Sequence, residues 1–364
     1  MEDGEPSRLL DLPTCVRDLL QNRGDGTQHD PKAGDTPPNE RLKFPANNAS
    51  RRWETRETAE AMIISFDIGG TAIKGGIARS ETDIVPLGRR PTPRDDFAAF
   101  VETLRDIIAE TGEQPNGIAL SIAGVVDPDT QRLICANIPC IHDRTLAADL
   151  EAELGLPVLI ANDADCFAIA EAGLGAGRGH RIVFGAILGT GVGGGLVADG
   201  RLVNEAGGFA GEWGHGPIIA TAAGNPPVAI PAYACGCGQK GCVDTVGGAR
   251  GLERLHKTLH DLDLASEEII AQWRDGEEKA TWTIGVYVDL VASPLALTIN
   301  ITGATIVPVG GGLSNVEPLL AELDHAVRAR ILRKFDRPLV VRSECRIEPG
   351  LIGAALLGLK AETA

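Results

Sequence analysis

Three glycine-rich turns are the first residues whose types and spacing could do chemistry, because each follows a short apolar run. The first holds Asp67, Gly69, Gly70, Thr71 and Lys74, the second Gly189, Thr190 and Gly191, and the third Gly310, Gly311 and Gly312. Glycines let the backbone approach an anion closely, and consecutive amides in a turn form an anion-binding concavity. The three turns therefore predict a site for the phosphates and the adenosine part of a nucleotide, although a single turn of this kind is common in plain hairpins.

The side chains of the first turn divide between two tasks. Thr71 and Lys74 can add a hydroxyl donor and a cation for a phosphate. Asp67 would repel a phosphate, so it suits Mg²⁺ or the water shell of that ion. The spacing excludes a P-loop, because no G-x-x-x-x-G-K-[ST] occurs, and it fits a dinucleotide fold poorly.

Asn162 and Asp163 stand where an apolar run ends and a helical pattern begins. Transfer of a phosphoryl group to a hydroxyl needs a proton acceptor near the nucleophile, and Asp163 is the candidate general base. The alternative is that both side chains only cap the following helix. These residues alone leave the two interpretations open.

A tight cluster of cysteines offers a metal site. Cys235, Cys237 and Cys242 follow a Cys-x-Cys-x₄-Cys pattern with glycines between them. Three thiolates and one histidine complete a tetrahedral zinc site. A disulfide or three buried thiols are the alternatives, and the disulfide is disfavoured in a reducing compartment.

Composition limits the setting of these residues. The 364 residues exceed what one compact core usually holds, so two domains are expected. The formal net charge of −16 argues against nucleic acid or an anionic membrane as a partner. We see no apolar run near the length of about 20 residues that spans a bilayer, and no signal peptide. A cytoplasmic protein is expected.

Residues 1–61 differ from the rest, being rich in Pro, Asp, Glu, Arg and Asn. They predict a mostly disordered extension. The alternative is that the functional protein starts at Met62. From Met62 the pattern is α/β. It predicts a helix after a cap at Asp95, a strand over 118–126 and a hairpin at Asp199-Gly200. A final helix is expected over 349–359.

The three turns resemble the two phosphate motifs and the adenosine motif of the actin-like ATPase superfamily, and the remaining motifs resemble its ROK family of sugar kinases. Asn162-Asp163-Ala164 and the alanine-rich helix ending at Glu171 are similar to the ROK segment in which Asn holds the sugar and Asp is the base. The segment from Gly207 to His215 and the cysteine cluster resemble the ROK zinc signature. The resemblance implies Zn²⁺ on His215, Cys235, Cys237 and Cys242, with Glu212 and His215 also touching the sugar.

Two departures from the family pattern affect the implied sugar site. Asp244 stands where Glu is usual, and it is retained as a sugar ligand although it is one methylene shorter. Ala123 stands where Pro is common, while Gly124 can still offer a backbone contact. Asn137, in Asn-Ile-Pro, resembles a family ligand for a sugar hydroxyl.

The resemblance implies two actin-like (ribonuclease H-like) ATPase domains with ATP and sugar in the cleft between them. The small domain is expected over 62–173 plus 347–364, and the large domain over 174–346. The implied reaction is transfer of phosphate from ATP, with Mg²⁺, to the 6-hydroxyl of a sugar. The cysteine segment and residues 162–168 look most like those of N-acetylglucosamine kinases. Glucose, N-acetylmannosamine and fructose are alternative substrates. A sugar-sensing transcriptional regulator without activity is the alternative of another class, and we expect a homodimer.

Overall fold

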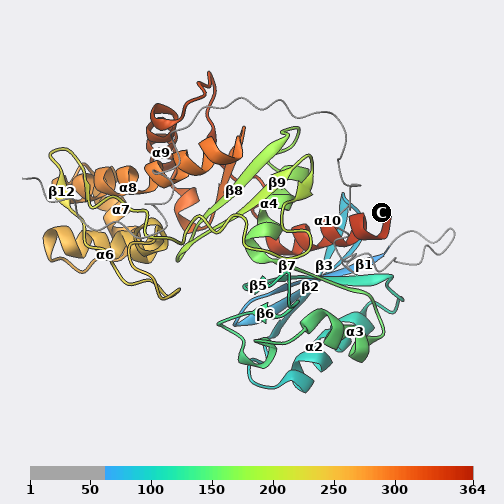
Figure 1. Cartoon of the computed structure of the whole chain (residues 1–364). Helices are drawn as coiled ribbons and strands as arrows, with labels where there is room; N and C mark the ends of the chain where they lie inside the picture. The colour runs from blue at the N-terminus through green and yellow to red at the C-terminus, as the bar shows by residue number, and fades with distance from the viewer. Residues whose placement is uncertain (1–61, 364) are drawn as a thin grey trace, which may run out of the picture. The chain divides into compact units, whose positions relative to one another are not determined.

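Two five-stranded mixed sheets carry the fold, and their strands pair in the same order. The structure is a computed structural model that describes residues 62–363 (Figure 1). The expectations for residues 1–61 lie outside the described residues.

The first sheet has the order β3 (Asp83–Pro91), β2 (Ala72–Ser80), β1 (Ile63–Ile68), β4 (Gly117–Ile122) and β7 (Val158–Asn162). Neighbours β3, β2 and β1 are antiparallel, whereas β1, β4 and β7 are parallel. Because parallel strands end at the same edge, the turn after β1 and the start of the helix after β7 come to one side of this sheet.

The second sheet repeats this plan with β10 (Arg201–Leu202), β9 (Val192–Ala198), β8 (Ile182–Leu188), β13 (Val307–Gly310) and β14 (Val340–Arg342). Here β10, β9 and β8 are antiparallel, and β8, β13 and β14 are parallel. The expected hairpin joins β9 to β10, with Asp199 and Gly200 both at positive φ. The repeated sheet confirms the α/β, actin-like fold class.

Helices cover the sheets and join their strands. They are α2 (Phe97–Glu110), α3 (Leu146–Leu154), α4 (Asp163–Gly173), α5 (Asp244–Gly247), α6 (Ala249–His260), α7 (Ser266–Arg274), α8 (Glu278–Thr302), α9 (Glu317–Arg330) and α10 (Pro349–Thr363). Two short 3₁₀ turns are η1 (Pro139–Ile141) and η2 (Gly312–Asn315), and two small ladders pair β5 (Val125–Val126) with β6 (Leu133–Ile134) and β11 (Ala222–Ala223) with β12 (Val228–Ala229).

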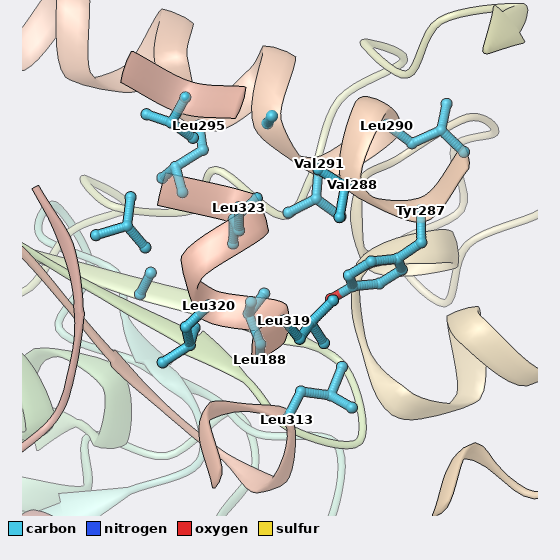
Figure 2. Close-up of a cluster of buried hydrophobic side chains, with 14 of the residues drawn as sticks. Leu188, Tyr287, Val288, Leu290, Val291, Leu295, Leu313, Leu319, Leu320 and Leu323 are labelled. Atoms are coloured by element: carbon cyan, nitrogen blue, oxygen red, sulfur yellow. The ribbon is translucent and has the colours of Figure 1, made fainter. Parts of the chain in front are cut away.

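The largest apolar core lies where α8 and α9 pack against the second sheet. Figure 2 shows Leu188 of β8, Tyr287 of α8 and Leu319 of α9 gathered in this core. Tyr287 is fully buried, and its hydroxyl donates to the Gly247 carbonyl at 2.8 Å. A buried phenol needs such a partner, so this contact fixes α5 against α8.

Helix α4 packs closely against α10 and both sheets. A Cβ on Gly353 of α10 would lie 2.0 Å from the carbonyl oxygen of Cys166, so only glycine allows this approach. All residues of α4 from Ala164 to Glu171 are buried. The helix that begins at Asp163 is therefore held from every side.

The expectation that no apolar run has the length of a membrane span is wrong for α8. Within residues 62–363, α8 is the one helix long and apolar enough to cross a membrane by length and composition. However, 61% of its apolar window is buried inside the fold, as in the core helix of a soluble protein.

Two local predictions are corrected. The cap of α2 is Asp96, whose side chain accepts from the Ala99 N–H at 3.1 Å, and not Asp95. The strand expected over 118–126 breaks between β4 and β5, where Gly124 approaches β6 so closely that a Cβ would lie 2.7 Å from the Ile134 oxygen. The division into two domains stays a prediction, since the described residues belong to one compact unit.

Candidate active site

A cavity of about 400 Å³ collects the predicted base and several predicted nucleotide residues. Its lining includes Asp67, Lys74, Asp163, Gly310 and Gly311. Gly69, Gly70, Thr71, Gly189, Thr190, Gly191 and Gly312 do not line it. Another cavity, of about 850 Å³, lies against α8 and contains no predicted site residue.

Lys74 sits between two carboxylates in this cavity. Its Nζ lies 3.2 Å from Asp67 Oδ2 and 2.5 Å from Glu348 Oε2. Burial lowers the pKa of Lys74, but the hydrogen bond to Glu348 and the charge of Asp67 outweigh it, so the pKa is raised. Lys74 stays charged at neutral pH and is available to a phosphate only by exchanging these partners.

Asp67 is placed by its strand and by the start of α10. Its Oδ1 accepts from the Ser121 hydroxyl at 3.2 Å. A Cβ on Gly350 would lie 2.5 Å from that same oxygen. The first turn of α10, whose N–H groups favour a negative charge, therefore approaches Asp67 closely.

The third glycine turn rests directly on the second. Gly311 has φ +86°, and a Cβ there would lie 2.5 Å from the Leu188 carbonyl group and 2.6 Å from the Gly189 nitrogen. Ser314 Oγ donates to the Gly311 oxygen at 2.7 Å, which closes the turn. The contacts of a Cβ at Gly311 would be with the backbone of Leu188 and Gly189, so no change of side-chain rotamer could relieve them.

We predict that Gly311→Ala separates the two turns. Strain at such a position costs roughly 1–3 kcal/mol, and the clash adds to it. The KM for ATP should rise at least about tenfold, with a smaller change in the KM for the sugar. Steady-state kinetics measure both. Gly285→Ala, at a helical position where a Cβ meets nothing within 4 Å, is the control; equal losses in both variants would contradict the prediction.

Asp163 starts α4 at the end of β7. Its Oδ1 lies 2.9 Å from the Ala164 nitrogen, and Asn162 Oδ1 lies 2.8 Å from the same nitrogen. Asn162 is therefore the residue that caps α4, and the helix does not need the contact of Asp163 for its cap. The Asp163 carboxylate lines the cavity, and desolvation by the surrounding protein raises its pKa to about 6. The charges of Asp67 and Glu212 add to the rise.

A pH profile should report this pKa. The predicted base can accept a proton only when it is ionised, so kcat/KM should fall with a one-proton slope as the pH drops below about 6. Asp165→Asn should keep this limb, although burial raises the pKa of Asp165 to about 7. A profile that stays flat down to pH 5 would contradict the assignment, and loss of the limb in Asp165→Asn would move it to Asp165.

None of the other predicted sugar ligands lines the cavity. Asn162 Nδ2 donates to the Gly124 oxygen at 2.9 Å, so both ends of its side chain are engaged. Asn137 is exposed next to Gly70, whose Cβ position is 3.4 Å from that of Asn137. Gly124, Asn162 and Asp163 are therefore held as one unit, with Asn137 close to the first turn.

Glu212 and His215 are paired on the loop after β10. Glu212 Oε2 lies 3.8 Å from His215 Nε2, and each side chain is 35% exposed. Burial raises the pKa of Glu212, while His215 partly opposes the rise. The pair leaves Nδ1 of His215 facing the cysteines.

Asp244 lies between the second glycine turn and the cysteines. Its Oδ1 accepts from the Val192 N–H at 2.8 Å, and its Oδ2 lies 3.7 Å from Cys235 Sγ. A Cβ on Gly191 would lie 2.4 Å from Asp244 Oδ1. The carboxylate of Asp244 thus occupies the space beside Gly191, and the predicted contact of this turn with a phosphate stays a prediction.

The four predicted metal ligands converge. The ligand atoms of His215, Cys235, Cys237 and Cys242 all lie within 4.8 Å of one another. Cys237 and Cys242 Sγ are 3.6 Å apart, as are Cys235 Sγ and His215 Nδ1. A tetrahedral zinc with bonds of about 2.3 Å places sulfurs about 3.8 Å apart, so this donor set fits the ion.

Sequence reasoning missed the side of the cavity that comes from the segment before α10. Ser343, Cys345, Arg346 and Glu348 line it together with Arg342 of β14. Phe167 of α4 also lines it, and its ring lies 2.7 Å from the Cβ position of Gly310. The segment 343–348 has no periodicity, and only its proximity to α10 could have drawn attention to it.

Known proteins align with nearly all of the described chain. The ROK family model matches residues 63–361. An N-acetyl-D-glucosamine kinase of Yersinia enterocolitica is 34% identical over 301 residues, covering 82% of this chain and 99% of that protein. The N-acetylgalactosamine kinase AgaK of a Shewanella species is 36% identical over 300 residues, covering 82% and 96%.

A solved structure gives the same result at the level of the fold. The ROK family glucokinase of Streptomyces griseus, in complex with glucose and AMPPNP, is similar with a TM-score of 0.64 at 26% identity. The match covers 82% of this chain and 99% of the glucokinase. Together with the family match these findings confirm the resemblance seen in the motifs, and the chain belongs to the ROK family.

Proposed function

We propose that this protein transfers the γ-phosphate of ATP to the 6-hydroxyl of an N-acetylhexosamine, with N-acetylglucosamine as the first choice. The observation that supports this most is one cavity lined by Asp163, Asp67 and the third glycine turn. A base, a carboxylate suited to Mg²⁺ and the turn proposed for the adenosine part thus share one space, and phosphoryl transfer to a hydroxyl requires that these groups lie close together.

In the proposed reaction the 6-hydroxyl oxygen bonds to the γ-phosphorus while the bond from that phosphorus to the β,γ-bridging oxygen breaks and ADP leaves. The hydroxyl proton passes to Asp163. The amides of the glycine turns at Gly69–Thr71 and Gly189–Gly191 hold the phosphates, and the turn at Gly310–Gly312 holds the adenosine part. Lys74 leaves Glu348 or Asp67 to meet a phosphate. Asp67 would hold Mg²⁺, which offsets charge on the phosphates when bound.

The sugar is proposed to lie between two sets of ligands. Gly124, Asn137, Asn162 and Asp163 come from the first-sheet side, and Glu212, His215 and Asp244 from the second. Zinc on His215, Cys235, Cys237 and Cys242 is proposed to be structural, because all four positions of a tetrahedron are filled by protein. It would fix His215, which is also proposed to touch the sugar.

The substrate is proposed from the relatives, which include kinases named for N-acetylglucosamine and for N-acetylgalactosamine. Purified protein should be assayed with ATP and N-acetylglucosamine, N-acetylgalactosamine, N-acetylmannosamine, glucose and fructose. We expect the highest kcat/KM with N-acetylglucosamine. Highest efficiency with glucose or fructose would remove the N-acetylhexosamine assignment, and no turnover with any sugar would remove the kinase.

A cytoplasmic homodimer without nucleic acid or membrane partners is part of the proposal. The net charge of −16 disfavours polyanions, and the exposed apolar side chains Leu297, Ile301 and Leu332 suit contact with a second copy. Light scattering tests the dimer. A salt-sensitive shift of duplex DNA would favour the transcriptional regulator in place of the kinase.

A further inference from the structure

Helix α4 carries two buried carboxylates that neither act as the base nor line the cavity. Asp165 is 3% exposed and Glu171 is fully buried. We propose that both are positioning residues: Asp165 holds the sugar loop (residues 204–215) and Glu171 holds the nucleotide loop (residues 343–348). The inference rests on the proposed function, since it assigns one loop to each substrate.

Asp165 reaches the sugar loop through Asn204. Asn204 Nδ2 donates to Asp165 Oδ2 at 3.0 Å and to the Ala210 oxygen at 2.8 Å. Asn204 Oδ1 accepts from the Ala210 N–H at 3.1 Å. Both backbone groups of Ala210 are thus tied to one side chain that Asp165 orients, two residues before Glu212.

A glycine keeps this arrangement possible. Gly208 has φ +140°, and a Cβ there would lie 2.8 Å from Asn204 Oδ1. The Gly208 N–H donates to the Val126 oxygen at 3.0 Å, which ties the same loop to β5. The path of the loop from Asn204 to Glu212 is therefore set at Gly208 and at Ala210.

Glu171 binds the nucleotide loop directly. Its carboxylate accepts from the Cys345 N–H at 2.7 Å, the Glu344 N–H at 3.2 Å and the Ala176 N–H at 2.9 Å. Three donors satisfy a buried carboxylate that would otherwise be costly to place there. The loop so fixed contributes Cys345, Arg346 and Glu348 to the cavity lining.

The spacing of the two carboxylates explains how one helix serves two loops. Asp165 and Glu171 are six positions apart, and at about 100° per residue they point about 120° away from each other. Asp163 lies on the same buried helix. One rigid element thus sets the base, the sugar loop and the nucleotide loop relative to one another, which in-line transfer requires.

Steady-state kinetics with ATP and N-acetylglucosamine test the two roles. Asp165→Ala should raise the KM for the sugar at least about tenfold and leave the KM for ATP within about twofold. Glu171→Gln puts an amide group among N–H donors. This variant should raise the KM for ATP at least about tenfold and leave the KM for the sugar within about twofold. Asp165→Asn keeps an acceptor for Asn204 and should restore most of the sugar KM.

A double-mutant cycle separates the Asn204 contact from general destabilisation. Asp165→Ala added to Asn204→Ala should change the sugar KM by less than about twofold beyond Asn204→Ala alone. Full additivity, or equal increases in both KM values for Asp165→Ala and Glu171→Gln, would overturn the proposal. If Asp165→Ala does not fold, Asn204→Ala and Asp165→Asn carry the same comparison. An inactive wild-type protein would instead refute the proposed function, and sugar and ATP affinities measured by calorimetry would then decide the positioning roles.

Discussion

Asp163→Asn should lower kcat by roughly 10²–10⁴-fold, the usual contribution of a general base. The amide keeps the shape of the side chain and can still accept from the Ala164 N–H, but it cannot take the proton of the 6-hydroxyl. The KM for the sugar should change far less, because Asn162, Glu212 and His215 are untouched. Rapid-quench or coupled steady-state assays give both values.

The capping interpretation makes the opposite prediction for the same substitution. Asn and Asp cap helices comparably, and Asn162 already accepts from the Ala164 nitrogen at 2.8 Å. If capping were the only role of Asp163, the variant would keep near wild-type turnover. That result would remove Asp163 as the base, and Asp165, which is buried against Asn204, would be the next carboxylate to test.

Removing one cysteine of the predicted metal cluster should cost the protein both its zinc and much of its thermal stability. The purified protein should hold about one zinc per chain, and Cys237→Ser should lose it. Structural zinc contributes folding free energy directly, so the Tm should fall by roughly 10 °C or more. Elemental analysis by mass spectrometry and a thermal melt measure the two results.

Cys140→Ser is the matched control for the cysteine prediction. Cys140 lies outside the cluster, and its Sγ donates to the Pro93 oxygen at 3.3 Å, a bond that a serine hydroxyl can also form. The control should keep its zinc and most of its Tm. Active, folded wild-type protein without metal would contradict the zinc assignment.

The sequence could predict the residues that lie at the ends of regular elements. The apolar run of β7 followed by Asn162 and Asp163 carries both a strand end and a helix cap, so the position of the base is a local property. The glycine turns after β1, β8 and β13 are local in the same way. The repeat of one sheet plan could be expected from these turns and from the resemblance.

Other parts depend on contacts between distant segments. Strand β3 is exposed along much of its length, contains Pro86 and Gly88 and pairs with a register shift, so no alternation marks it. The nucleotide loop meets Lys74 across 274 positions of the chain. Helix α9, in contrast, carries a local sequence signal, since Leu319, Leu323 and Val327 follow helical spacing.

The roles of individual side chains were harder to foresee than their positions. Gly191 is predicted from the sequence to contact a phosphate, and nothing in the sequence indicates that the Asp244 carboxylate lies beside it. Lys74 is predicted from the sequence to supply a cation for a phosphate, and its ion pairs with Asp67 and Glu348 could not be foreseen. In both cases the partner comes from a segment whose path only the folded chain determines.

The most direct test of the central claim is the product formed from ATP and N-acetylglucosamine. We predict one ADP per sugar consumed and, by ³¹P and ¹³C NMR, phosphate on the 6-oxygen. The 6-deoxy analogue should compete with the sugar without supporting ADP formation above the background without sugar. ATP consumption that does not depend on the sugar, or phosphate found on another oxygen, would contradict the account.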